Sequence, residues 1–270
     1  MGTGRRIGVI GIGNMGTALI AGLLKTGQIS KEEVCASDIS AQRRYQVSRT
    51  YGVKCFSDNR MVVTRSDILI IAVEPKHVKS VLEDIREALT GQLLISIAAG
   101  TPIEFLKQTL RKEIPIVRAM PNNPCLVGEG MTVITSTTEV TNEKLKVAEG
   151  IFSSVGKVLV LDEHFFNAVT GLSGSGPAYI YLVIEGLVEG GVKSGLPEDT
   201  ALTLAVQTVV GAGKMVFETQ INPSKLRQMV TTPGGTTVEG LKELERGNVK
   251  TFFSTAVEKA AQRSQELTRT

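Results

Sequence analysis

Two short stretches of this sequence combine residue types and spacings that suit the binding of small anionic molecules. The first is Gly11-Ile12-Gly13-Asn14-Met15-Gly16, which follows an apolar run at 7–10 and precedes an apolar helical pattern that stops at Gly27. Between a strand and a helix, the first glycine permits a tight turn, the second lets a pyrophosphate approach the backbone, and the third lets helix and strand pack closely. This context predicts a dinucleotide-binding site.

The second stretch lies near the C-terminus, where Thr231-Thr232-Pro233-Gly234-Gly235-Thr236-Thr237 leads into a helical pattern with an acidic first turn. The proline fixes one φ angle, and the glycines free the next two positions from side-chain bulk. The backbone N–H groups of Gly235, Thr236 and Thr237 can then converge at a helix N-terminus on a small anion such as a carboxylate. An N-capped turn between two helices is the alternative interpretation of the same residues.

An acidic residue follows the second predicted strand, at 33–37, where Rossmann-type proteins select their nicotinamide dinucleotide. Asp38 lies 22 positions beyond Gly16, and a carboxylate there holds the ribose hydroxyls of NAD and repels a 2′-phosphate. Arg43 and Arg44 follow on the next predicted helix. They either reach such a phosphate or belong to a solvated helix face, so the preference between NADH and NADPH stays open.

Three further segments follow predicted strands and therefore lie where open α/β sheets bind their ligands. They are Ala72-Val73-Glu74-Pro75, Ala98-Ala99-Gly100 and Met120-Pro121-Asn122-Asn123-Pro124. The small residues at 98–100 leave room for a flat nicotinamide ring, and Asn122 is a candidate to orient the amide of that ring. Each segment also has an interpretation as ordinary loop packing.

The sequence offers no obvious strong acid or base. It has two histidines, His77 and His164, neither with a paired carboxylate at a diagnostic spacing, and a structural role is the favoured interpretation of both. We find no Ser-His-Asp signature, no H-E-x-x-H and no metal-binding cluster. Hydride transfer to an already protonated C=N bond needs little more than positioning, because the iminium is its own electrophile. A hydroxyl such as that of Thr237 can orient or relay the proton on the nitrogen.

An alternating pattern of strands and helices must position the glycine loop. Strand patterns lie at 7–10, 33–37, 53–55, 68–73, 93–97, 114–118, 131–135 and 158–161, and helices follow Asp58 and Pro102 and occupy 75–89 and 142–153. Such alternation predicts right-handed βαβ crossovers and a parallel, doubly wound sheet. We assign residues 1–161 to a Rossmann-type dinucleotide-binding domain of an α/β protein.

From Asp162 onward the sequence predicts only helices, at 163–170, 177–193, 198–217, 223–229, 238–246 and 249–266. The segments 179–192 and 202–216 are apolar on nearly every face, which is typical of helices that are buried all round. In a domain this small, a second subunit is the natural cover. We therefore predict that residues 162–270 form an all-α dimerisation and substrate-binding domain in an intertwined homodimer.

Composition is that of an ordinary globular protein, with 21% charged residues, 42% hydrophobic residues and a net charge of +3. The small charge and the lack of a Lys/Arg stripe with interleaved aromatics argue against a nucleic-acid partner. Three cysteines without C-x-x-C spacing indicate a reducing compartment. Residues 1–6 do not read as a signal peptide, and the apolar run at 68–73 is too short to span a bilayer. We expect a cytoplasmic protein without a membrane partner.

The chain resembles the pyrroline-5-carboxylate reductases over essentially its full length. The motifs that carry the resemblance are Ile10-Gly11-Ile12-Gly13-Asn14-Met15, Ala98-Ala99-Gly100, Arg118-Ala119-Met120-Pro121-Asn122, Leu172-Ser173-Gly174-Ser175-Gly176-Pro177-Ala178-Tyr179 and Thr232-Pro233-Gly234-Gly235-Thr236-Thr237. The last two are the specific ones, because many dehydrogenases share glycine fingerprints. The resemblance implies reduction of 1-pyrroline-5-carboxylate to L-proline by NADPH or NADH, the final step of proline synthesis. It also implies helical domains that dimerise, and dimers that often assemble into decamers.

Together with the motifs above, the resemblance assigns site residues. The substrate-binding residues are Ser175, Thr232, Gly234, Gly235, Thr236 and Thr237, and the hydroxyl of Thr237, near the ring nitrogen, is the catalytic group. The cofactor-binding residues are Ile10, Gly11, Gly13, Asn14, Met15, Asp38, Asn59, Ala72, Val73, Glu74, Pro75, Ala98, Ala99, Gly100 and Asn122. Two positions depart from the family pattern. Glu74 stands where the family usually has lysine, and Asp38 stands where NADPH-preferring members have a neutral or phosphate-friendly residue.

Two other functions compete with this one. A β-hydroxyacid dehydrogenase shares the two-part plan, but it needs a helix lysine followed four residues later by asparagine, and Lys214 is followed there by Glu218. The second alternative is a nucleotide-binding regulatory protein that descends from the reductase and has no turnover. An altered Gly-Gly-Thr-Thr turn would favour that alternative, and in this sequence the turn at 234–237 is intact.

Overall fold

A computed structural model of the chain describes residues 5–269, with side chains described up to residue 267. The chain divides into two compact units, Met1–Gly174 together with Lys259–Thr270, and Ser175–Glu258, and each is described by itself. From residues 1–6 we expect no signal peptide. Residues 1–4 of that segment lie outside the described residues.

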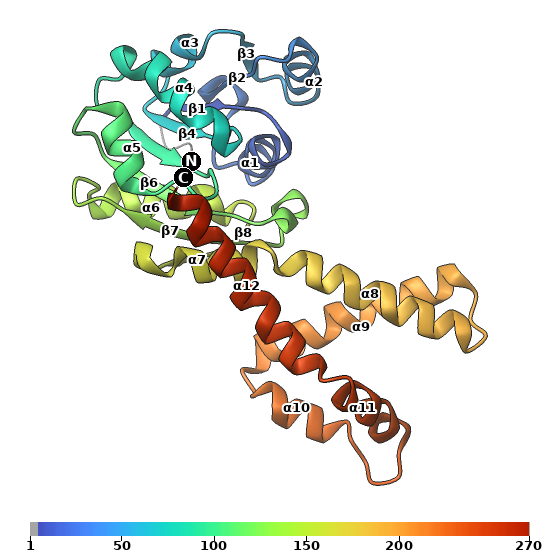
Figure 1. Cartoon of the computed structure of the whole chain (residues 1–270). Helices are drawn as coiled ribbons and strands as arrows, with labels where there is room; N and C mark the ends of the chain where they lie inside the picture. The colour runs from blue at the N-terminus through green and yellow to red at the C-terminus, as the bar shows by residue number, and fades with distance from the viewer. Residues whose placement is uncertain (1–4, 270) are drawn as a thin grey trace. The chain divides into compact units, whose positions relative to one another are not determined.

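The first unit is built on one eight-stranded sheet with the strand order β3-β2-β1-β4-β5-β6-β7-β8 (Figure 1). The strands are β1 (Ile7–Ile10), β2 (Val34–Ser37), β3 (Lys54–Phe56), β4 (Ile68–Ile71), β5 (Leu93–Ser96), β6 (Ile116–Met120), β7 (Gly130–Ser136) and β8 (Gly156–Val160). The predicted doubly wound sheet is confirmed, and most of its strand pairs are parallel. The expectation that every strand runs parallel is wrong at one edge, because β7 pairs antiparallel with β6 and parallel with β8.

The connection between β6 and β7 explains this reversal. It contains only the short 3₁₀ helix η3 (Asn123–Val127). A parallel return requires a crossover of about a dozen or more residues, usually with an α-helix. The chain therefore turns back beside β6.

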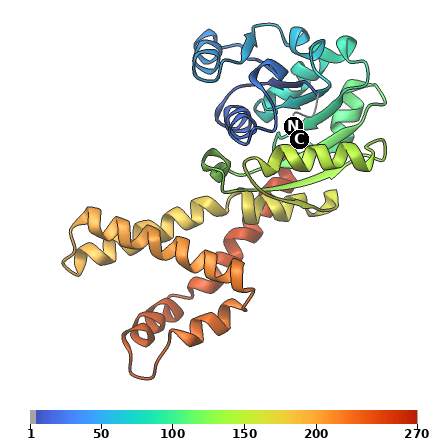
Figure 2. The same ribbon diagram turned by 180° about the vertical axis from the view of Figure 1, so that it is seen from behind.

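Helices cover both faces of the sheet (Figure 2). One core cluster packs α1 (Asn14–Lys25), α2 (Ala41–Tyr51) and α6 (Asn142–Ser153) on one face, and a second packs α3 (Asn59–Val63), α4 (Pro75–Ile85) and α5 (Ile103–Leu110) on the other. The residues of β4 alternate between these clusters and all are buried. Burial on both faces explains why the strand appears in the sequence as an unbroken apolar run.

The first unit continues beyond β8 through η4 (Glu163–Phe165), α7 (Phe166–Val169) and a π-helical turn, η5 (Thr170–Gly174). The buried Arg118 of β6 fastens this segment, because its Nη1 donates to Glu163 Oε1 at 2.9 Å and its guanidinium lies 4.6 Å from the centre of the Phe166 ring. The N-terminal segment of this compact unit extends to Gly174, beyond our boundary at 161. The functional domain boundary between 161 and 162 stays a prediction.

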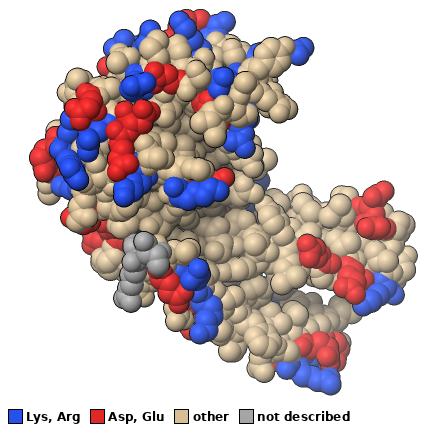
Figure 3. All heavy atoms as spheres, turned by 45° about the horizontal axis from the view of Figure 1, so that its top comes forward, with Lys and Arg blue, Asp and Glu red and all other residues tan. Residues whose placement is uncertain are grey.

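The second unit consists of α8 (Gly176–Lys193), α9 (Glu198–Thr219), α10 (Pro223–Met229), α11 (Thr236–Arg246) and the first part of α12 (Val249–Arg269). Large apolar side chains of α8 and α9 are exposed, with Leu182 at 67% and Leu204 at 53% of their full accessibility. On the face drawn in Figure 3, these helices show long stretches of uncharged surface. By length and composition alone α9 would also qualify as a membrane span, a weak indication because core helices of soluble proteins pass the same test.

Candidate functional site

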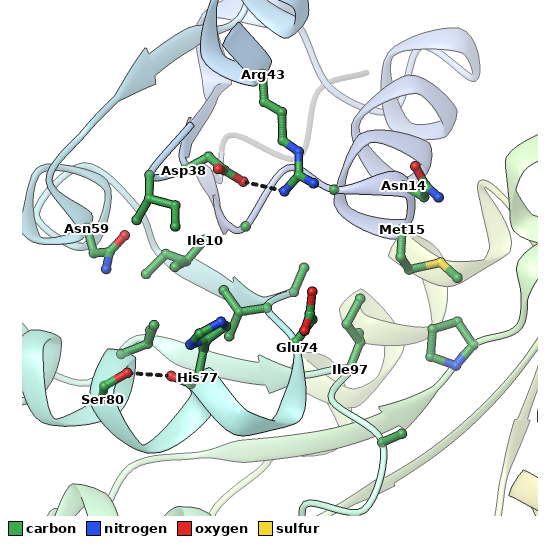
Figure 4. A pocket seen from close by; sticks show the side chains of 18 of the residues that line it. Ile10, Asn14, Met15, Asp38, Arg43, Asn59, Glu74, His77, Ser80 and Ile97 are labelled. Carbon is green, nitrogen blue, oxygen red and sulfur yellow. Dashed lines mark hydrogen bonds and ion pairs between the residues drawn. The ribbon is translucent and has the colours of Figure 1, made fainter. Parts of the chain in front are cut away.

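A cavity of about 680 Å³ opens in the first unit at the carboxyl ends of the central strands (Figure 4). Most of the predicted cofactor residues line it together, namely Ile10, Gly11, Gly13, Asn14, Met15, Asp38, Asn59, Ala72, Val73, Glu74 and Ala99. Of the other predicted residues, Pro75, Ala98, Gly100 and Asn122 lie outside this lining. The structure therefore gathers the ends of β1, β2, β4 and β5 around one space.

The glycine loop that precedes α1 has the geometry to accommodate a pyrophosphate. Gly11 has a φ of +93°, and a Cβ atom there would lie 2.7 Å from the carbonyl oxygen of Ala72. A Cβ atom on Gly16 would lie 2.1 Å from the carbonyl oxygen of Gly11, whereas one on Gly13 would meet nothing within 4 Å. The open space at Gly13 adjoins the first N–H groups of α1, which have no helical partner and favour negative charge.

Asp38 directly follows β2, and groups of the protein itself hold its carboxylate. Its Oδ2 accepts a hydrogen bond from the N–H of Ile12 at 3.0 Å, and its Oδ1 accepts one from the N–H of Ser40 at 2.8 Å. Nη1 of Arg43 lies 3.7 Å from Oδ2 in an ion pair. The side chain is only 6% exposed, and its carboxylate braces the glycine loop against the start of α2.

The opposite wall comes from one face of α4. His77, Ser80 and Val81 line the cavity there, and in Figure 4 His77 and Ser80 lie across from Asp38 and Arg43. Sequence reasoning did not assign these α4 residues to the site, nor Ile39 and Ile97 of the lining. It raised Arg43, Met120 and Pro121 as candidates, and all three line the cavity. The helical spacing of positions 74, 77 and 81 was a usable signal, because residues three and four apart share a helix face.

Glu74 is the N-cap residue of α4 and lines the cavity. Nζ of Lys76 lies 2.7 Å from its Oε2. The hydrogen bond from Lys76 and its charge lower the pKa of the Glu74 carboxyl, so the group stays ionised at neutral pH. Lys76 therefore lies two residues after position 74, where the family usually has a lysine. Its positive charge offsets the negative charge of Glu74.

Asn122 has protein partners for both ends of its amide. Its Oδ1 accepts from the N–H of Met131 at 2.8 Å, and its Nδ2 donates to the carbonyl of Ser173 at 3.0 Å. It therefore joins β7 to the π-helical turn, while its neighbours Met120 and Pro121 face the cavity. A contact between Asn122 and a nicotinamide amide stays a prediction.

The predicted anion-binding turn lies in the second unit. Gly234 has a φ of +71°, Gly235 is the N-cap residue, and α11 begins at Thr236. The N–H of Gly235 donates to the carbonyl of Thr232 at 2.9 Å, so it closes the turn. The N–H groups of Thr236 and Thr237, at the first two helical positions, remain as anion donors. The side chain of Thr237 is exposed, and Ser175 directly precedes α8.

Comparisons with known proteins identify the family of this chain. A family model described as pyrroline-5-carboxylate reductase dimerisation matches residues 163–267, and one described as NADP oxidoreductase, coenzyme F420-dependent, matches residues 6–100. The pyrroline-5-carboxylate reductase of Methanosarcina acetivorans is 42% identical over 97% of this chain and 98% of its own length. The chain belongs to the pyrroline-5-carboxylate reductase family.

Solved structures of the family agree. A pyrroline-5-carboxylate reductase from Coxiella burnetii is similar with a TM-score of 0.92 and 37% identity, over 98% of this chain and 99% of that one. The Plasmodium falciparum pyrroline carboxylate reductase, solved with NADP bound, has a TM-score of 0.91 and 34% identity, over 99% of this chain and 100% of that one. The family and the two-part fold predicted from the sequence motifs are confirmed.

Proposed function

We propose that this chain is a pyrroline-5-carboxylate reductase, which transfers a hydride from NADPH or NADH to the C=N bond of 1-pyrroline-5-carboxylate and forms L-proline. The observation that carries the proposal is a glycine-loop cavity and an intact Gly-Gly-Thr-Thr turn in a chain that matches a family member over 97% of its length. The reaction is the last step of proline biosynthesis.

The residues of the cavity divide between the two ends of the dinucleotide. Gly13 and the first N–H groups of α1 hold the pyrophosphate, because an N-terminal helix dipole favours anions. Asp38 and Asn59 line the part of the cavity that would receive the adenosine, and the small Ala99 together with Pro121 would frame the flat nicotinamide ring. When bound, the reduced nicotinamide supplies the hydride.

The substrate is held by Ser175, Thr232 and the turn at 234–237. The N–H groups of Thr236 and Thr237 bind its carboxylate at the N-terminus of α11. The hydroxyl of Thr237 orients or relays the proton on the ring nitrogen. Because the protonated imine carries its own positive charge, the chain needs no strong general acid, and positioning provides most of the rate.

We also propose that residues 162–270 hold two chains together and that the enzyme works in the cytoplasm. The family model matched at 163–267 describes dimerisation, and the exposed apolar side chains of α8 and α9 support a partner subunit as their cover. A decamer built from such dimers is the larger assembly that the family resemblance implies. No nucleic-acid or membrane partner is part of this proposal.

Thr237→Ala and Thr237→Ser test the role of the hydroxyl. We expect Thr237→Ala to lower kcat about tenfold or more, because the group that orients the ring-nitrogen proton is lost. Thr237→Ser keeps a hydroxyl and should retain most of the activity. The dissociation constants of NADPH and NADH, measured by titration calorimetry, should stay nearly unchanged in both variants. Equal losses of rate and of dinucleotide affinity in Thr237→Ala would remove Thr237 from this role.

A further inference from the structure

We infer that Arg43 is the residue that selects NADPH, and that Asp38 holds the glycine loop without selecting NADH. The inference rests on the proposed function and assigns the cofactor preference of the same site. It opposes the usual meaning of an acidic residue after the second strand, which is a preference for NAD. Three features of the described residues carry it.

The first feature is the direction of the Asp38 carboxylate. Each of its oxygens already accepts a backbone hydrogen bond, from Ile12 N at 3.0 Å and from Ser40 N at 2.8 Å. Hydrogen bonds of this kind stabilise the negative charge inside the protein. With 6% of the side chain exposed, little carboxylate surface is left to grip a ribose diol or to repel a 2′-phosphate.

The second feature separates the two arginines at the start of α2. Nη1 of Arg44 donates to the carbonyl of Asp38 at 2.7 Å and to the carbonyl of Ile39 at 3.1 Å. These bonds fix the turn after β2, and a guanidinium that moved to a phosphate would leave both carbonyls without this donor. Arg44 is also absent from the lining of the cavity. Arg44 is therefore a structural residue of the turn.

The third feature is the freedom of Arg43. Its side chain lines the cavity and is 57% exposed. Its separation of 3.7 Å from Asp38 exceeds the usual hydrogen-bond range of about 2.7–3.2 Å, and exposed ion pairs of this kind are weak. Arg43 can therefore exchange Asp38 for a phosphate, with which a guanidinium forms two parallel charge-assisted hydrogen bonds.

The start of α2 adds to the positive potential at this point. The helix has 11 residues, Ser40 caps it by accepting from the N–H of Arg43 at 3.3 Å, and its first turn contains no acidic residue. The cavity also contains Glu74, whose charge Lys76 offsets at 2.7 Å. The part of the cavity that receives the adenosine therefore favours the negative charge of the 2′-phosphate of NADPH. NADH lacks this phosphate and binds without that contribution.

Titration calorimetry of the full-length protein with NADPH and with NADH, in the absence of substrate, tests the inference. We expect Arg43→Gln to raise the dissociation constant of NADPH about 10- to 100-fold, the size of a lost charge-assisted contact, and to change that of NADH less than about threefold. Arg49→Gln, an exposed arginine on the same helix outside the cavity, is the matched control and should change neither. Equal effects of Arg43→Gln on both dinucleotides, or no effect, would overturn the assignment.

Asp38→Asn provides the second arm. Because Asp38 braces the loop used by both cofactors, we expect weaker binding of NADPH and NADH by similar factors. A loss of NADH affinity with NADPH affinity kept or improved would show that Asp38 selects NADH and would contradict the inference. If the wild-type protein binds both dinucleotides but does not reduce 1-pyrroline-5-carboxylate, the proposed function fails while the binding comparison still decides the role of Arg43.

Discussion

Gly13 is the N-cap residue of α1 and Gly16 lies in its first turn, and the two glycines have opposite surroundings. A Cβ atom on Gly16 would press against a backbone carbonyl at 2.1 Å, whereas one on Gly13 would project into open space. Gly13 also has a φ of −70°, which any residue can adopt. One glycine is therefore required by packing, and the other by the approach of a ligand.

Alanine substitutions separate these two requirements. Gly16→Ala should lower the free energy of unfolding by about 1–3 kcal/mol, because the added methyl group overpacks the contact between helix and loop. Gly13→Ala should leave stability nearly unchanged and weaken NADPH binding about tenfold or more, because the methyl group occupies the space of the pyrophosphate. Urea unfolding and titration calorimetry measure the two effects. Unchanged NADPH affinity in Gly13→Ala would place the pyrophosphate elsewhere.

The end of β6 and the π-helical turn form one packed element. Asn122 joins Met131 of β7 to Ser173, and a Cβ atom on Gly174 would lie 2.9 Å from the terminal methyl group of Met120. Arg118, earlier on β6, holds Glu163 and Phe166 of the same segment. This strand end therefore anchors residues 163–174.

Asn122→Ala distinguishes an anchor from a cofactor ligand. We expect the variant to lose about 1–3 kcal/mol of unfolding free energy, because two part-buried backbone groups lose their partner. NADPH affinity should change less than about threefold. Asn123→Ala, at the exposed neighbouring amide, is the control and should alter neither property. A large loss of NADPH affinity at unchanged stability would instead support a contact between Asn122 and the nicotinamide amide.

Physical causes explain which parts of the fold and of the site could be predicted from the sequence and which could not. The strand β4 could be predicted because burial on both faces leaves a continuous apolar run. The direction of β7 was missed, since it depends on the length of the connection after β6 rather than on the strand itself. The loop after β1 could be predicted from the glycine motif, and the loops after β4, β5 and β6 from the rule that open α/β sheets bind ligands at the carboxyl ends of their strands. His77 and Ser80 were missed because the rotation of α4 decides which of its faces meets the cavity, and the engagement of Asn122 depends on a partner 51 residues away.

At the scale of the whole molecule, we expect a second subunit to cover the exposed apolar side chains of α8 and α9. Leu182→Glu places a charge on a side chain that is 67% exposed in the single chain and that we expect to be buried between two subunits. The variant should shift the molar mass in light scattering from at least twice 28.9 kDa toward 28.9 kDa, or aggregate. Tyr45→Glu changes a side chain that is 64% exposed on α2 and should leave the assembly intact. An unchanged assembly in Leu182→Glu would place the interface elsewhere.

The most direct test of the whole account follows NADPH and NADH oxidation by absorbance, in parallel, after addition of 1-pyrroline-5-carboxylate, with L-proline quantified at the end. We predict oxidation that depends on the substrate, with one proline formed for each dinucleotide oxidised, and a higher kcat/KM with NADPH than with NADH. Protein that binds the dinucleotide but oxidises neither form in the presence of the substrate would contradict the reductase. It would favour a regulatory protein without turnover or a reductase of a different cyclic imine.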